Sequence, residues 1–399
     1  MLIPKSYWRI LLAVLFSVVG IFHIFYVFII LSLPTTPPWI MGDWLINYQG
    51  GLVRRGLIGE IILQLSHLLN VNVIFVVVIF QALIFALFLV STYRLAVKTP
   101  FSALTAILVF SPAFLLFPVL DTNGAMRKEI MLFALLAVLC CYLTFSKANI
   151  SRSLPIFVGL SSIVLVMGHE MLVVYLPYLV CAFLIYENGL GPATKRMVLA
   201  FFPAALILCF LIVFGKSGEQ VVQAICASLQ TQAPPDCFTP EMVPGAISFV
   251  GKDLSAAHGF VLASIVETTG ITYIITGILS FIPLVLIYFA ERFAVIRANA
   301  GLRFWLAICI FCSLIGSIPL FWIVADYGRI IYIHVTCLSL LALMVIHDRS
   351  NTPMRLNPRQ AVAWALTFVY IGSWRLIHWK ATADTAFPWI KGIFDRFHS

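Results

Sequence analysis

Long runs of apolar residues, separated by short polar connections, organise this chain. Because the apolar core of a bilayer is about 30 Å thick, a helix needs about 20 apolar residues to cross it. Eleven runs approach that length, and we interpret each as a membrane-spanning helix. They cover residues 9–33, 71–93, 101–120, 130–146, 154–168, 171–186, 197–214, 270–290, 302–323, 330–346 and 360–377. The pattern predicts an all-α polytopic membrane protein with about eleven transmembrane helices in a single integral membrane domain, 1–399.

Two connections are longer than the others. Residues 34–70 form the first loop, and residues 215–269 form a polar insertion that we expect to cap the same face of the membrane. The two short runs that meet at Gly168, His169 and Glu170 fit either two half-length helices or one long broken helix.

The composition supports this class and gives an orientation. Apolar residues make up 62% of the 399 residues and charged residues 10%, with a mean hydropathy of +1.05, which excludes a soluble globule. Fourteen of the 25 basic residues, but three of the 16 acidic ones, fall on the side of the N-terminus. Because basic loops stay inside, the N-terminus is predicted to be cytoplasmic, in a multi-pass protein of the bacterial cytoplasmic membrane. The net charge of +9 is then a topology signal, and no nucleic-acid partner is expected.

The first outer loop is the most unusual polar segment. It reads GDWLINYQGGLVRRGLIGE and contains Asp43, Arg54, Arg55 and Glu60. Two arginines in an outer loop oppose the charge rule, so we interpret them as functional. The alternative is that these arginines have no role in chemistry and only contact lipid head groups.

A helix is predicted directly after these arginines, with its apolar residues on one face. Glu60 and the other polar residues share the opposite face, and Leu63 breaks the pattern. We expect this helix to lie in the membrane interface. Backbone N–H groups at its start and the guanidinium groups of Arg54 and Arg55 would together bind phosphate. The apolar face consists of Leu57, Ile58, Ile61, Ile62, Leu65, Leu68 and Leu69.

Charged residues also gather at three other junctions predicted to be outside. Each group alone is typical of an ion pair that caps a helix, but four groups on one side of a membrane favour a common site. Carboxylates there can act as general bases, and arginines can neutralise a phosphate leaving group. The implied substrate is amphiphilic, with an anionic head and a long apolar tail. The three groups are Asp121 with Arg127, Lys128 and Glu129; His169 with Glu170; and Asp326 with Arg329.

This arrangement resembles the GT-C superfamily of membrane glycosyltransferases, and is equally similar to the O-antigen and capsule repeat-unit polymerases of bacteria. The resemblance rests on the first-loop aspartate with its interfacial helix, a second acid after the third span, broken helices and a capping loop. It implies that a polyprenyl-(di)phosphate-linked sugar or oligosaccharide is used at the periplasmic face, in contact with membrane lipids, to assemble surface polysaccharide.

The resemblance implies that Asp43 takes the place of the catalytic aspartate and Asp121 that of the second-loop acid, and the pattern of charged residues predicts the other roles. Asp43 would act as the base, with Asp121 or Glu170 as further acids. Arg54, Arg55, Arg127 and Arg329 would bind the phosphate groups, while Glu60, His169 and Asp326 would support them. Because Trp44 stands where many members have a second acid, no cofactor is expected, although some members use a divalent metal.

Two other function classes fit an all-helical chain. A secondary transporter or lipid-linked-glycan flippase could use His169, Glu170, Glu267 and Asp326 as a proton relay. A membrane-bound acyltransferase would use a buried histidine, and His334 is the residue to consider; we interpret it instead as a hydrogen-bonded structural histidine.

One disulfide is expected. Cys226 and Cys237 flank the polar stretch CASLQTQAPPDC in the capping loop, which the charge pattern places in an oxidising compartment. Its expected role is to stiffen the loop.

Overall fold

A computed structural model of the chain describes residues 2–3, 5–146, 151–239, 244–266, 270–290, 293–346, 354–355 and 358–389. Almost all of its regular structure is helical, and the pair of two-residue strands joins the N-terminus to residues 354–355. The elements are β1 (Leu2–Ile3), α1 (Lys5–Ser32), α2 (Gly42–Leu45), α3 (Gly56–Leu69), α4 (Val73–Ala96), α5 (Ala103–Val109), α6 (Phe117–Leu120), α7 (Thr122–Ala125), α8 (Glu129–Phe145), α9 (Ser153–Gly168), η1 (Glu170–Tyr175), α10 (Pro177–Glu187), α11 (Pro192–Ala200), α12 (Phe202–Phe214), α13 (Glu219–Leu229), η2 (Gln230–Gln232), η3 (Pro235–Cys237), η4 (Ser248–Gly251), α14 (Leu254–Val266), α15 (Gly270–Phe289), α16 (Ala294–Ala298), α17 (Ala300–Ser317), α18 (Leu320–Ile323), α19 (Tyr327–Val345), β2 (Met354–Arg355), α20 (Pro358–Ser373) and α21 (Ala383–Ala386).

The predicted all-α membrane architecture is confirmed. Within the described residues, seven helical segments are long and apolar enough to cross a membrane. Three more predicted spans are present as shorter helices of 16 or 17 residues, α8, α9 and α20. The seven segments are Ser6–Ser32, Val73–Ala96, Glu170–Glu187, Pro192–Phe214, Gly270–Phe289, Ala300–Ile323 and Tyr327–Val345.

The run at 101–120 does not form the single helix that its apolar composition predicts. Helix α5 ends after seven residues, a turn follows, and the four-residue α6 completes the segment. Pro112 explains the break, because proline lacks the backbone N–H and disfavours a helical conformation at Ser111. The Ser111 hydroxyl accepts a hydrogen bond from the backbone N–H of Ala113 and stabilises the turn.

The two short runs around His169 form two helical segments. Helix α9 ends at Gly168, His169 has an extended backbone, and η1 begins at Glu170 and leads into α10. The structure therefore has two separate helical segments, the first of the two arrangements that the sequence allowed, and the polar turn lies between them.

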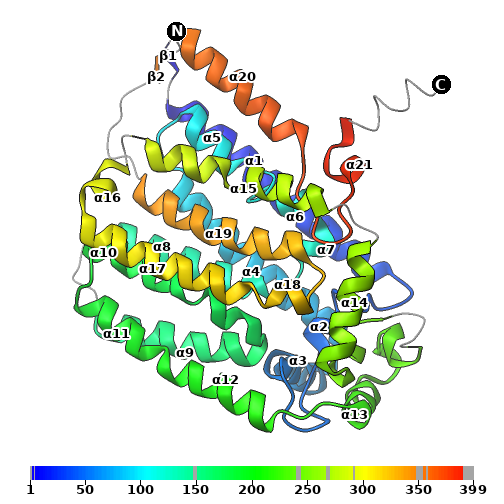
Figure 1. The fold of residues 1–399 in the computed structure, drawn as a ribbon. Helices are drawn as coiled ribbons and strands as arrows, with labels where there is room; N and C mark the ends of the chain where they lie inside the picture. The colour runs from blue at the N-terminus through cyan, green and yellow to red at the C-terminus, as the bar shows by residue number, and fades with distance from the viewer. Residues whose placement is uncertain are drawn as a thin grey trace, which may run out of the picture.

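The long helices lie side by side, and short elements lie at both ends of the bundle (Figure 1). α2, α3, α7, α13, α14 and α18 lie at one end, whereas β1, β2 and α16 lie at the other (Figure 1). The loops that the charge pattern assigned to a common side thus share one end of the molecule.

Helix α3 has apolar residues on its buried face and also on its exposed face. Ile58, Ile62 and Leu63 are buried, whereas Ile61 and Leu68 are exposed. Leu63, which interrupts the predicted apolar face, therefore belongs to the face that packs inward. A Cβ on Gly59 would clash with the backbone carbonyl of Ile46, so glycine at this position lets the first loop pack against α3.

The described part of the capping loop packs on the first loop. A Cβ on Gly50 would lie 2.8 Å from the carbonyl oxygen of Val221 in α13, so the two loops approach closely there. A disulfide joins Cys226, at the end of α13, to Cys237 in η3.

Candidate functional site

A cavity of about 670 Å³ lies where the loops of one end converge. Its wall combines residues of the first loop, the turn before α8, the turn after α9, the capping loop, the start of α19 and the loop after α20. Trp39, Phe249 and Phe260 make part of the wall apolar. The charged side chains that line it are Arg54, Arg55, Arg127, Lys252 and Arg329, with Asp43, Glu170, Asp253 and Asp326.

Asp43 is the most deeply buried carboxylate on this wall, with 2% of its surface exposed. Neither of its carboxylate oxygens has a hydrogen-bond partner among the described residues, and Nη1 of Arg55 is 3.9 Å away. Burial raises the pKa of this carboxyl, but the nearby charges of Lys128 and Arg55 together lower the pKa by a larger amount. The net shift of the pKa is therefore downward. Asp43 is therefore ionised at neutral pH and able to accept hydrogen bonds from a ligand.

Arg55 directly precedes α3, as its N-cap, and has a left-handed backbone (φ 66°), which is uncommon for a residue with a side chain. The buried Nζ of Lys128 donates a hydrogen bond of 2.9 Å to the Arg55 carbonyl oxygen and holds this conformation. The Arg55 side chain turns into the cavity wall, where its Nε donates to both carboxylate oxygens of Glu170 at 3.0 Å. Burial lowers the pKa of Lys128 to about 8, although Asp43 partly opposes this shift.

Arg127 is a buried cation held by backbone groups. Its Nη1 donates to the carbonyl oxygen of Trp39 at 2.6 Å, and its Nε donates to that of Asn123 at 3.4 Å. Among the described residues, no carboxylate lies within ion-pair distance of this guanidinium. Its charge is thus available to an anion in the cavity.

A second ionic cluster lies at the start of α19. Nη1 of Arg329 lies 2.9 Å from Asp326, and its Nε lies 3.1 Å from Oε1 of Glu129. His169 stands between two acids, with Nε2 4.0 Å from Glu129 and Nδ1 3.9 Å from Glu170. Burial and the charge of Arg55 lower the pKa of His169 to about 3, so it is neutral at pH 7.

Asp121 joins this end through a residue that the sequence analysis did not single out. Its carboxylate accepts hydrogen bonds from the backbone N–H of His378 at 2.7 Å and from Nδ1 of the same residue at 2.8 Å. Burial raises the pKa of Asp121, but its contacts with His378 lower the pKa by a larger amount, so the net shift of the pKa is downward. His378 lines the cavity, while Asp121 lies behind it. One signal in the sequence marked His378: it directly follows the last predicted span, on the side predicted to be outside.

The structure thus brings most of the predicted site residues together and leaves Glu60 apart. Glu60 does not line the cavity, because its carboxylate accepts hydrogen bonds from the backbone of Tyr48 and from the side chains of Gln49 and Gln64. Glu267 lies outside the described residues. Arg54 does line the cavity, with an exposed side chain.

His334 lies away from the cavity, in the helical bundle. Its Nδ1 is 2.7 Å from the Tyr178 hydroxyl and its Nε2 is 3.0 Å from the Ser317 hydroxyl. Both ring nitrogens are hydrogen-bonded, as expected of a structural histidine. Within the described part of the chain, no group of three or more His, Cys, Asp or Glu side chains is arranged to hold a metal ion.

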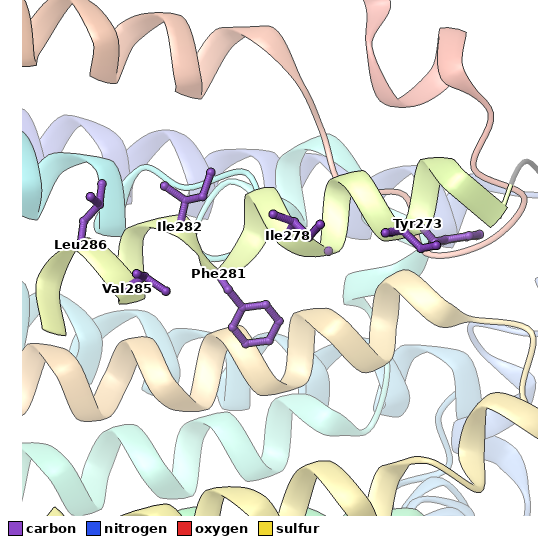
Figure 2. Close-up of a pocket in the computed structure, with 8 residues that line it drawn as sticks. Tyr273, Ile278, Phe281, Ile282, Val285 and Leu286 are labelled. Atoms are coloured by element: carbon purple, nitrogen blue, oxygen red, sulfur yellow. The ribbon is translucent and has the colours of Figure 1, made fainter. Parts of the chain in front are cut away.

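A second hollow, of about 600 Å³, runs along α15 and is lined by apolar side chains from Ile274 to Leu286 (Figure 2). It begins at Tyr273, whose hydroxyl accepts a hydrogen bond from the backbone N–H of Ala381, three residues after His378. One end of this apolar hollow is thus tied to the loop that lines the charged cavity.

Residues 10–261 match the model of a family described as uncharacterised membrane protein Rv1490, which is more than half of the chain. The chain belongs to the Rv1490 family. The family description names a membrane protein and no activity. No curated protein and no solved structure matches the chain. In this member of the Rv1490 family, the matched region contains Asp43, Asp121 and Glu170, whereas Arg329 and His378 lie beyond it.

Proposed function

We propose that this protein is a membrane glycosyltransferase or repeat-unit polymerase that acts at the outer face of the cytoplasmic membrane. It takes sugars from a polyprenyl-phosphate or polyprenyl-diphosphate carrier and assembles cell-surface polysaccharide. In this proposal the chain crosses the membrane about eleven times in a GT-C-like arrangement, and its N-terminus is cytoplasmic.

One observation carries the proposal: a single cavity contains an excess of cations beside a buried carboxylate, neither of whose oxygens has a hydrogen-bond partner among the described residues. Five cationic side chains and four carboxylates line the wall, and Lys128 lies directly behind it. Arg127, which is held by carbonyl groups, is suited to a phosphate group because its planar fork donates parallel hydrogen bonds. Asp43 is suited to a sugar hydroxyl group.

In the proposed reaction, the cations and the carboxylate of the cavity have different roles. The bond between the anomeric carbon and the phosphate oxygen breaks, and the oxygen of an acceptor hydroxyl forms the new glycosidic bond. Negative charge grows on the departing phosphate, where Arg127, Arg55 and Arg329 stabilise it. Asp43, which the sequence predicted to be the base, accepts a hydrogen bond from a hydroxyl group of the bound sugars, and the neighbouring cations keep it ionised. A separate group on the cavity wall then takes the proton of the acceptor hydroxyl.

The apolar surfaces fit the lipid part of such a substrate. Trp39, Phe249 and Phe260 pack against one another in the wall of the cavity, with ring centroids 5.1–6.1 Å apart. The apolar hollow along α15 offers a place for a polyprenyl chain beside the bundle (Figure 2).

Surface glycan made by a deletion strain tests this function. We expect gels of its polysaccharide to show either single-repeat products, which indicate a polymerase, or one missing sugar, which indicates a transferase. Complementation with Asp43→Asn or Arg127→Gln should leave this defect, while His67→Gln, on the exposed surface of α3, should restore the wild-type pattern. Immunoblots of the membrane fraction control for the amount of each variant. An unchanged glycan profile in the deletion strain would contradict the proposal and favour a transporter or flippase.

A further inference from the structure

Asp121 and His378 form a buried pair that the proposed function does not yet use. Their side chains are 7% and 15% exposed, and they lie 257 positions apart in the sequence. Nδ1 of His378 lies 2.8 Å from both carboxylate oxygens of Asp121. This contact makes Nδ1 the protonated nitrogen, since a carboxylate accepts and cannot donate. Nε2 is then the nitrogen with a free lone pair.

Several features fix the position of His378. Its backbone N–H donates to Asp121, and its carbonyl oxygen accepts from the backbone N–H of Gly328 at 3.2 Å. Two glycines leave room for it: a Cβ on Gly124 would lie 2.7 Å from the Cβ of His378, and a Cβ on Gly328 would clash with the Ile377 carbonyl. Contacts from α7, the start of α19 and Asp121 therefore hold one imidazole at the wall of the cavity.

We propose that His378, oriented by Asp121, takes the proton from the acceptor hydroxyl during glycosyl transfer. This inference rests on the proposed function. As the hydroxyl oxygen attacks the anomeric carbon, its proton moves to Nε2 of His378, and the bond to the phosphate oxygen breaks with its electron pair leaving on the phosphate. The resulting imidazolium is stabilised by Asp121 and returns its proton to water. His378 is then the catalytic base and Asp121 a positioning residue.

The surroundings of Asp43 favour His378, and not Asp43, as the group that takes the proton. Lys128 and Arg55 stabilise the ionised form of Asp43, which makes it a weak proton acceptor. In this proposal Asp43 orients a hydroxyl group and balances the charge of the cations, while the proton goes to the histidine. The two groups belong to one cavity, with the arginines that bind phosphate on the same wall.

Two substitutions separate catalysis from folding. His378→Asn keeps a side-chain N–H that can donate to Asp121 as Nδ1 does, but it lacks the nitrogen that accepts the proton. Asp121→Asn keeps the size of the side chain and removes the charge that orients the imidazole. His67→Gln is the matched control, because His67 is an exposed histidine at the same end of the molecule and does not line the cavity.

The measurement is the initial rate at which intact cells incorporate a pulse of tritiated glucose into surface polysaccharide, between external pH 5.5 and 8.5. For the wild type we expect the rate to rise with pH as the base loses its proton. The charged groups shown to interact with His378 are Asp121, from the α6–α7 junction, and Asp326, from the start of α19. The other titratable groups on the elements around it are Tyr273 in α15, Arg127 on the cavity wall and Lys380 in its own loop.

We expect His378→Asn to lower the rate about 100-fold or more at pH 7 and to abolish the rise with pH. Asp121→Asn should lower the rate less and move the rise to lower pH, because loss of the negative charge makes the imidazolium easier to deprotonate. A His378→Asn protein that is present at normal level and retains half of the wild-type rate would overturn the inference. So would an Asp121→Asn profile whose rise stays at the wild-type pH.

The controls also separate this inference from the proposed function. If Asp43→Asn and Arg127→Gln abolish glycan synthesis but His378→Asn does not, the proposed function stands and the role of His378 is wrong. If none of these variants changes the glycan, the proposed function itself fails. Where His378→Asn accumulates poorly, the pH profile of Asp121→Asn decides the question.

Discussion

Nε of Arg55 lies 3.0 Å from each carboxylate oxygen of Glu170, so an ion pair joins the start of α3 to the turn after α9. These residues are 115 positions apart, and their side chains are 31% and 16% exposed. The pair closes one side of the cavity, and it positions the guanidinium 3.9 Å from Asp43.

Breaking this pair should leave one partner as an uncompensated, largely buried charge. We expect Arg55→Met and Glu170→Met each to cost about 1–3 kcal/mol of unfolding free energy. The double variant should cost less than the sum of the two, because both charges are then absent. SDS titration of the purified protein measures the three values. Strictly additive losses would show that the two side chains do not interact.

Arg127 provides a test of phosphate recognition that preserves charge. Arg127→Lys keeps the cation but loses the planar fork and one of the two hydrogen bonds to the carbonyl groups of Trp39 and Asn123. We expect glycan synthesis in whole cells to fall about 10- to 100-fold, a loss in the range of a charged hydrogen bond. Arg297→Lys, at the other end of the bundle, is the matched control and should retain full activity. A fully active Arg127→Lys protein would exclude bidentate recognition at this position.

His169 should make the protein sensitive to acid. The pKa of His169 is about 3 in the folded protein and 6.5 in the unfolded chain. Between these two pH values the unfolded chain therefore binds more protons than the folded protein. Stability from this group is present above pH 6.5 and is lost as the pH falls toward 3. We expect the melting temperature in detergent to drop between pH 6.5 and 4.5, and His169→Gln to reduce that drop. An identical pH dependence in His169→Gln would assign the sensitivity to other groups.

Gly59 should tolerate no side chain. A Cβ there meets the backbone carbonyl of Ile46, which cannot move without displacing the first loop and Asp43 with it. We expect Gly59→Ala to abolish both accumulation in the membrane and activity. Gly372→Ala is the matched control, since nothing lies within 4 Å of its Cβ and alanine favours the helical conformation of α20. Immunoblots of membrane fractions compare the two variants, and normal levels of Gly59→Ala would contradict the packing described for α3.

The disulfide allows a test of orientation. If the capping loop is outside, Cys226→Ser leaves Cys237 as a thiol that a membrane-impermeant maleimide labels in intact spheroplasts. The wild-type pair should be labelled only after reduction. Labelling of the variant only after the membrane is permeabilised would reverse the predicted topology.

The local sequence was sufficient to predict the class of this protein and the ends of most of its helices. The length of an apolar run decides whether it crosses a bilayer, and this property does not depend on the rest of the chain. The prediction failed at residues 101–120, where Pro112 in an apolar run already indicated a break. It also assigned Leu63 to no face, although α3 packs this residue inward.

The sequence by itself determined that the charged junctions lie at helix ends on one side, because bulk water and the bilayer sort charged from apolar residues along the chain. Only the tertiary structure decided which of those charges meet. It placed Glu60 among backbone groups outside the cavity, and it joined Asp121 to His378 across 257 residues. Such contacts depend on which helices pack together and on glycines such as Gly328 that permit close approach, and no periodic pattern of residues encodes them.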